Sequence, residues 1–192
     1  RDLKPQNILV KQLVRRGGNR GKSSGADGGA GVDQVKLADF GSAKVHDRTM
    51  ATTRGVGTDG WQSPEAIRGE ETGPAADVFS LGLLFFYCLT GGRHVFGEDP
   101  VKRKTKMMKL AMADDEDNDE EERAEAAETE DPKMARNVER LLSSSCVAPP
   151  ELVPAAVALV SKMLRLRPTD RPSAKEVGYD PLFEAPSAGA AG

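Results

Sequence analysis

Short apolar runs near the start of the chain predict two β-strands. Ile8-Leu9-Val10 and Val35-Lys36-Leu37-Ala38 have the composition of strands. The residues between them, at about 15–33, are rich in Gly, Ser and Arg and have no apolar periodicity. We therefore expect a β-hairpin whose connection carries a flexible insertion.

The hydrophobic pattern after residue 60 predicts helices. Residues 77–89 are apolar on nearly every face, which is typical of a helix buried at the centre of a helical lobe. In residues 154–166 apolar side chains recur at steps of three and four, which predicts an amphipathic helix that Pro168 stops. Residues 101–113 favour another helix, and Ser63-Pro64-Glu65 places proline at a helix-opening position.

The sequence after residue 113 predicts one further short helix and two segments without packed structure. Ser173 followed by Glu176 predicts a capping box for a short helix. Residues 114–131 contain twelve Asp and Glu residues and only one Arg, so we expect a disordered, solvating insertion. The alternatives are that this acidic run folds onto the rest of the chain or recruits a basic partner. Residues 184–192 are predicted to form a frayed tail.

Composition narrows the class of protein. The net charge is −3, but residues 114–131 alone carry −11, so the rest of the chain is basic at +8. Cys88 and Cys146 have neither zinc-site spacing nor a disulfide framework, which favours a reducing, cytoplasmic environment. The longest apolar run, residues 81–89, is shorter than the roughly 18 residues of a membrane span, so we expect a soluble chain without membrane contact.

Three polar residues near the beginning have the types that phosphoryl transfer requires. Asp2 and Asn7 lie in Arg-Asp-Leu-Lys-Pro-Gln-Asn at 1–7, and Asp39 begins Asp-Phe-Gly at 39–41. Transfer of a γ-phosphoryl group needs a carboxylate beside the attacking hydroxyl and oxygen or amide ligands for Mg²⁺. These three residues supply those groups in the expected order.

With Gly57-Thr58 and Ser63-Pro64-Glu65, these motifs resemble the C-terminal lobe of the eukaryotic protein kinases over most of residues 1–183. The resemblance implies a mainly α fold with a short β-hairpin, a partial kinase domain at 1–183, and insertions at about 15–33 and 114–131. By this resemblance we expect the N-lobe to be missing from these 192 residues, because they contain no kinase-type glycine-rich loop, β3 lysine or αC glutamate. Because those parts position the nucleotide, we expect the isolated chain to be inactive.

The same resemblance implies roles for single residues in binding ATP and Mg²⁺ and in transfer to serine or threonine. Asp2 would orient the substrate hydroxyl and accept its proton. Lys4 would neutralise charge on the transferring phosphate, and Thr58 would bridge Asp2 and Lys4. Asn7 and Asp39 would be the protein ligands of Mg²⁺.

Other residues are implied to support the site. Gly41 would give the loop after Asp39 its backbone freedom. Glu65 would pair with Arg171, and Asp77 would accept hydrogen bonds from the backbone around Arg1 and Asp2. Candidate phosphorylation sites lie in the presumed activation loop, where a phosphate would pair with Arg1; the alternative is that these are exposed polar residues. They are Thr49, Thr52 and Thr53.

A narrower resemblance rests on residues 57–61, 77–82, 86–87 and 91–97. These segments are similar to the inositol-requiring stress sensor of the endoplasmic reticulum, a kinase/endoribonuclease family with ribonuclease L as a cousin, although Val95 stands where those relatives have proline. This implies a parent protein of the unfolded protein response on the cytosolic face of the endoplasmic reticulum membrane. Its partners would be a protein substrate or a second copy in trans, and RNA only through a downstream domain.

Two rival hypotheses remain open at this point. In one, the chain is a non-catalytic, nucleotide-gated dimerisation module that controls an attached endoribonuclease. In the other, it is an inactive fragment that binds no nucleotide. The sequence discloses neither the physiological substrate nor the activating signal.

Three further features favour structural roles over binding. The basic residues of 102–109 are predicted to form a solvated helix face, with RNA or partner binding as the alternative. His94 is predicted to pack or stabilise a turn rather than bind a metal. Cys88 is predicted to lie in the core.

Overall fold

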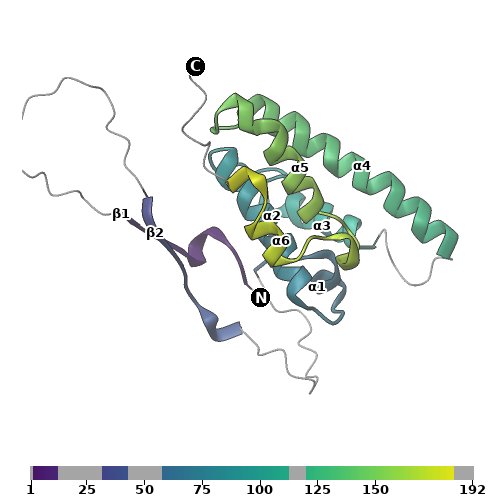
Figure 1. Ribbon diagram of the computed structural model, residues 1–192. Helices are drawn as coiled ribbons and strands as arrows, with labels where there is room; N and C mark the ends of the chain where they lie inside the picture. Colours follow the sequence, from purple (N-terminus) through teal and green to yellow (C-terminus); the bar gives the residue numbers. More distant parts are fainter. Residues whose placement is uncertain (1, 13–31, 43–57, 113–119, 184–192) are drawn as a thin grey trace, which may run out of the picture.

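The computed structural model describes residues 2–12, 32–42, 58–112 and 120–183. A two-stranded ribbon lies beside a body of packed helices, with the chain's first residues close to that body (Figure 1). The described part of the chain is therefore mainly α with a short hairpin, as the sequence predicted.

The ribbon consists of β1 (Ile8–Gln12) and β2 (Val32–Leu37), which pair antiparallel. Ile8 pairs with Leu37, and the register is irregular only between Lys11 and Gln12. The predicted hairpin is thus confirmed, and its connection lies outside the described residues. β2 begins at Val32, so it includes the last residues of the stretch that was predicted to be an insertion.

The helical body follows the predicted order with one addition. Pro64 opens the first helix and Gly69 ends it in the left-handed conformation, as expected for a glycine after a helix. The helices are α1 (Pro64–Arg68), α2 (Pro74–Leu89), α3 (Pro100–Met112), α4 (Glu120–Ser145), α5 (Val153–Met163) and α6 (Ala174–Gly178). Short 3-10 turns lie at Pro5–Asn7, Phe40–Ser42, Pro150–Leu152, Pro168–Asp170 and Pro181–Phe183.

α2 runs through the centre of the body, as its apolar sequence predicted. Phe79, Leu83 and Phe86 are at most 1% exposed, and burying each such side chain contributes about 1.5–3 kcal/mol. The prediction for Cys88 was wrong, because this residue is exposed. It lies on the helix stripe of Leu81 and Phe85, at steps of four and three, and this stripe is less buried than the opposite face.

α2 and α5 approach closely at a glycine. A Cβ on Gly82 would stand 2.9 Å from the Cβ of Met163 and 3.1 Å from Leu164 Cδ2. α5 ends at Met163, three residues before the predicted end, and Leu166 is buried in the irregular segment that follows. The residue before Pro168 is extended, since proline disfavours helical geometry in its predecessor.

α4 corrects the prediction for the acidic run. Residues 120–131 of the run belong to this helix instead of a disordered insertion, and residues 114–119 lie outside the described part of the chain. Glu and Ala favour helix, and acidic residues in a first turn interact well with the helix dipole. The second half of α4 supplies the anchor, since Met134, Val138 and Leu142 are buried at steps of four. This half was not predicted at all.

Side chains cap two other helices. Asp99 accepts hydrogen bonds from the backbone of Val101 and Lys102 at the start of α3. The predicted capping box of α6 is confirmed, because Ser173 and Glu176 each accept from the other's backbone N–H.

Within the described ranges, no helix is both long enough and apolar enough to cross a membrane.

Candidate active site

The carboxylate of Asp2 is the centre of the candidate site. Its Oδ1 accepts hydrogen bonds from the Thr58 backbone N–H at 2.9 Å and from the Thr58 hydroxyl at 2.8 Å. Its Oδ2 accepts from Lys4 Nζ at 2.7 Å and from Asn7 Nδ2 at 3.4 Å. Both oxygens are thus held by residues that the sequence analysis placed in the site.

Thr58 links its own segment to Asp2 and Lys4, which lie more than fifty residues earlier in the sequence. Its hydroxyl donates to Asp2 and accepts from Lys4 Nζ at 2.5 Å. The three side chains therefore form a closed triangle of charge-assisted hydrogen bonds. This is the bridging geometry that the resemblance implied for Thr58.

The contacts of Asp2 also set its protonation. Burial by itself raises the pKa of this carboxyl, but hydrogen bonds from Lys4 and from the Thr58 side chain and backbone outweigh burial. The net result is a pKa below the ordinary value for aspartate. Asp2 is therefore ionised at neutral pH and able to accept a hydrogen bond from an incoming hydroxyl.

The ribbon places Asn7 and Asp39 at the same end. Asn7 is buried and donates through Nδ2 to the backbone oxygen of Asp2 at 2.9 Å. The Ala38 backbone N–H donates to the Asn7 backbone oxygen at 2.8 Å, which continues the strand pairing up to Asp39. Asp39 is exposed and has a left-handed backbone, with φ 59°.

These residues fit a magnesium site of the type that a nucleotide completes. In the described ranges, no group of three or more His, Cys, Asp or Glu side chains is placed to hold a metal by itself. Mg²⁺ in phosphoryl-transfer sites usually takes one or two protein ligands and fills its shell with phosphate oxygens and water. The exposed Asp39 carboxylate and the Asn7 side-chain amide are donors suited to such a site.

Gly41 lies against the Asp39 carboxylate. Its backbone N–H donates to Asp39 Oδ1 at 3.3 Å, and a Cβ at this position would stand 3.2 Å from the same oxygen. A larger residue would therefore crowd the carboxylate. The predicted role of Gly41 in loop movement stays a prediction.

Glu65 and Arg171 form the ion pair that the sequence analysis predicted. The guanidinium contacts both carboxylate oxygens, at 2.7 and 2.9 Å, and both side chains are at most 3% exposed. Arg171 also donates to three backbone carbonyls and lies 4.9 Å from the ring centre of Phe79. The pair ties the end of the 58–65 segment to the C-terminal part of the body.

Several predicted residues cannot be compared with the structure. Arg1 and the candidate phosphorylation sites Thr49, Thr52 and Thr53 lie outside the described residues. Asp77 is in the first turn of α2, and its expected contacts are with the backbone around Arg1 and Asp2, of which Arg1 lies outside the described residues. The predictions for these residues stay open.

The basic side chains of α3 have a role that sequence reasoning missed. Arg103 donates to the backbone oxygens of Gly97 and Glu98, and Lys106 donates to that of Phe96. Lys104 Nζ contacts Asp59 at 2.8 Å, directly after Thr58 in sequence. These contacts hold the loops beside α3. The basic face of residues 102–109 is therefore only partly solvated, because several of its side chains bind neighbouring loops.

A pocket of about 230 Å³ begins next to Thr58. Its apolar lining comes from Ile67 of α1 and from Met107 and Met108 of α3. Its polar lining includes Asp59 and Lys104, which pair with each other. The lining of the pocket is therefore partly apolar and partly polar.

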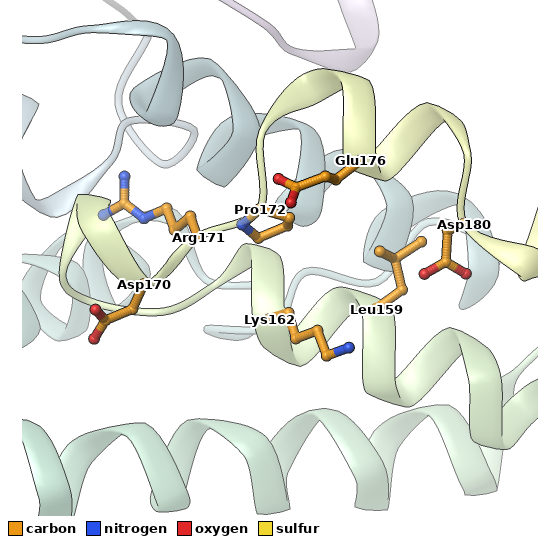
Figure 2. A pocket seen from close by; sticks show the side chains of 7 residues that line it. All are labelled: Leu159, Lys162, Asp170, Arg171, Pro172, Glu176 and Asp180. Carbon is orange, nitrogen blue, oxygen red and sulfur yellow. The ribbon is translucent and has the colours of Figure 1, made fainter.

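A larger pocket lies in another part of the body. It measures about 380 Å³, and its lining residues come from α5, α6 and the loops at their ends (Figure 2). They are Leu159, Lys162, Asp170, Arg171, Pro172, Glu176 and Asp180. None of the seven is among the predicted catalytic or magnesium-binding residues, so this pocket does not enter the chemistry.

Comparison with known proteins agrees with this geometry. A sequence model described as the protein kinase domain matches residues 1–183. The chain belongs to the protein kinase domain family. The kinase domain match begins at the Asp2 segment and ends at the last described residue.

Three curated relatives to which this chain is similar are named as kinase/endoribonucleases. IRE1b of Arabidopsis thaliana is 32% identical over 189 residues, which cover 95% of this chain and 16% of the relative. IRE1 of Oryza sativa is 31% identical over 190 residues, with 97% and 16% covered. The ire-1 protein of Caenorhabditis elegans is 35% identical over 127 residues. The chain thus spans 16% of the length of these plant relatives.

Proposed function

We propose that the protein containing this chain transfers the γ-phosphoryl group of ATP to serine or threonine hydroxyls of proteins. The observation that carries the proposal is the hydrogen-bonded triangle of Asp2, Lys4 and Thr58. It combines an ionised carboxylate, a lysine ammonium and a hydroxyl in one place, and each has a use in phosphoryl transfer.

The residues divide the work as follows. Asp2 accepts a hydrogen bond from the substrate hydroxyl and takes its proton as the hydroxyl oxygen bonds to the γ-phosphorus, while the bond from that phosphorus to the bridging oxygen breaks and ADP leaves. Lys4, which already contacts Asp2 at 2.7 Å, offsets negative charge on the transferring group. Thr58 holds the Asp2 and Lys4 side chains in their relative positions through its hydroxyl group. Bound Mg²⁺ would supply charge neutralisation at the phosphates, held by Asn7 and Asp39.

The likeness to the IRE1 kinase/endoribonucleases supports a narrower proposal. The parent protein would be a stress sensor of the unfolded protein response, exposed to the cytosol at the endoplasmic reticulum membrane. Its substrate would be another protein or a second copy of itself in a homodimer. Any RNA cleavage would belong to a segment outside these 192 residues.

The test separates chemistry from nucleotide binding in the full-length protein. Asp2→Asn should lower kcat for ATP-dependent serine or threonine phosphorylation at least about 100-fold, because the proton acceptor is lost. It should leave magnesium-dependent ATP binding intact. Asp39→Ala should weaken that binding as well, because a metal ligand is lost.

Asp170→Asn serves as the matched control, since Asp170 is exposed and lies outside the proposed machinery. It should behave like the wild type. If the wild type binds ATP and dimerises but transfers no phosphate, the nucleotide-gated module is the correct function. If it binds no nucleotide, the chain is an inactive fragment.

A further inference from the structure

His94 is a buried histidine with both ring nitrogens engaged. It is 3% exposed. Nδ1 lies 3.2 Å from the backbone N–H of Phe96, and Nε2 lies 2.8 Å from the backbone oxygen of Gly60. Because an N–H group can only donate, Nδ1 must be the acceptor, so the ring is neutral and carries its proton on Nε2. His94 therefore donates a hydrogen bond to the Gly60 carbonyl.

The surroundings of His94 keep it in this state. Its ring meets the Trp61 ring edge to face, with centres 5.0 Å apart, and lies 5.8 Å from the Phe96 ring. Burial, together with the positive charge of Arg103, lowers the pKa of His94 to about 4. The neutral ring, which accepts from Phe96 and donates to Gly60, is thus present throughout the physiological pH range.

Gly60 belongs to the turn that carries Thr58. Its φ of 94° is left-handed, and a Cβ there would stand 3.0 Å from Arg103 Cδ. The Trp61 backbone N–H donates to the Thr58 backbone oxygen at 3.1 Å and closes the turn. Ser80 donates from α2 to the Trp61 backbone oxygen at 2.7 Å. The turn is thus held by Asp2 at one end and by His94 and Ser80 at the other.

We propose that His94 is a positioning residue of the phosphoryl-transfer site, which fixes the Gly60 carbonyl and thereby presents Thr58 to Asp2 and Lys4. The kinetic part of this proposal rests on the proposed kinase function, and the structural part does not. His94 touches no reacting group itself. Its effect passes through the Thr58–Trp61 turn.

A pair of substitutions separates the two ring nitrogens. His94→Gln keeps a side-chain N–H donor where Nε2 stands and loses the acceptor for Phe96. His94→Asn keeps an acceptor where Nδ1 stands and loses the donor to Gly60. A residue that merely fills the core would respond to both changes alike, whereas a positioning residue would respond to the loss of the Gly60 bond.

In the full-length protein, His94→Asn should lower kcat roughly tenfold with KM for ATP little changed, as expected when a positioning contact is lost. It should also speed hydrogen exchange at the Thr58 amide, which donates to Asp2. His94→Gln should restore most of both properties. Thr90→Val is the control for loss of a buried hydrogen bond beside His94, since the Thr90 hydroxyl contacts the backbone oxygens of Phe86 at 2.7 Å and of Arg93 at 3.2 Å and neither lies in the Thr58–Trp61 turn.

Thr90→Val should lower overall stability without selectively exposing the Thr58 amide. The proposal is overturned if His94→Asn leaves Thr58 exchange at the level of this control, or if His94→Gln behaves like His94→Asn. A wild type with no kinase activity would contradict the proposed function alone, because the amide exchange measurement would still decide the role of His94.

Discussion

Both oxygens of the Asp2 carboxylate accept hydrogen bonds from other residues of the chain. These contacts show which features of the site a sequence motif can predict and which it cannot. The identities of Asp2, Lys4 and Thr58 were predictable because phosphoryl transfer restricts the residue types. The backbone N–H of Thr58 was not predictable, because its direction depends on the Thr58–Trp61 turn. We propose that His94 holds this turn through its hydrogen bond to the Gly60 carbonyl, 34 positions earlier in the sequence.

At the same scale, Glu65 and Arg171 should contribute unequally to stability. Arg171→Met leaves the Glu65 carboxylate buried without a partner and removes the donor from three backbone carbonyls. Its expected cost is about 3–5 kcal/mol. Glu65→Gln keeps the shape of the side chain and one acceptor, so its cost should be about 1.5–3 kcal/mol. Denaturant unfolding monitored by circular dichroism measures both.

The double variant provides the check on this assignment. Arg171→Met combined with Glu65→Gln should cost less than the sum of the single changes, because no unpaired charge remains. Equal costs for the two single variants would contradict the unequal contributions, and strict additivity would show that the two residues do not act as one unit.

Among the elements, the contact between α2 and α5 depends on the absence of a side chain at Gly82. Gly82→Ala should destabilise the fold by about 1–2 kcal/mol, since overpacking costs about 1–3 kcal/mol and exceeds the gain in helix propensity of about 1 kcal/mol. The clash is with Met163 Cβ, which cannot move without its backbone. The midpoint of urea unfolding reports the change.

Gly178→Ala is the natural comparison for Gly82→Ala. Gly178 ends α6, and a Cβ there meets no atom within 4 Å. This substitution should be neutral or slightly stabilising. If Gly82→Ala proves neutral as well, the two helices must be able to move apart at little cost.

Helix α4 shows why some elements could not be predicted. Glu and Ala favour a helix by propensity, but Pro132 and repulsion between the like charges of the acidic run oppose one locally, and burial of Met134, Val138 and Leu142 decides for the helix. Tertiary packing therefore determines that this helix forms. The second half of α4 packs against the helical body, and the first half extends the same helix. Helices α2, α3 and α5 were predictable because each carries its own apolar pattern. Their order and the hairpin followed from sequence, but the turn contacts around the site did not.

For the whole molecule, His94 makes stability depend on pH between about 4 and 6.5. In the unfolded chain the imidazole has its ordinary pKa of 6.5, whereas in the folded chain the pKa is lowered to about 4. Within this window the unfolded state holds more protons, so acidification favours unfolding. The loss on passing from pH 7 to below 4 should reach about 3 kcal/mol. Asp2, whose pKa is also lowered, adds a loss only below about pH 4.

The pH prediction is measured as the free energy of unfolding from pH 7 to 4.5. The chain has two histidines, so His46 is replaced by glutamine in both proteins compared. The protein that retains His94 should lose stability across this range. The His94→Gln protein should have a much flatter profile, and parallel profiles would mean that His94 is not buried in its neutral form.

The ribbon of β1 and β2 affects how the polypeptide behaves in the test tube. Leu9, Val10, Val35 and Leu37 are each at least half exposed, and the described sheet has only two strands, so both its edges are open. An apolar, open-edged ribbon is a template on which a second copy can add strands. We therefore expect this small sheet to promote self-association during expression and concentration. Charged substitutions at its exposed apolar positions, and not in the helical body, are the rational way to obtain a monodisperse sample.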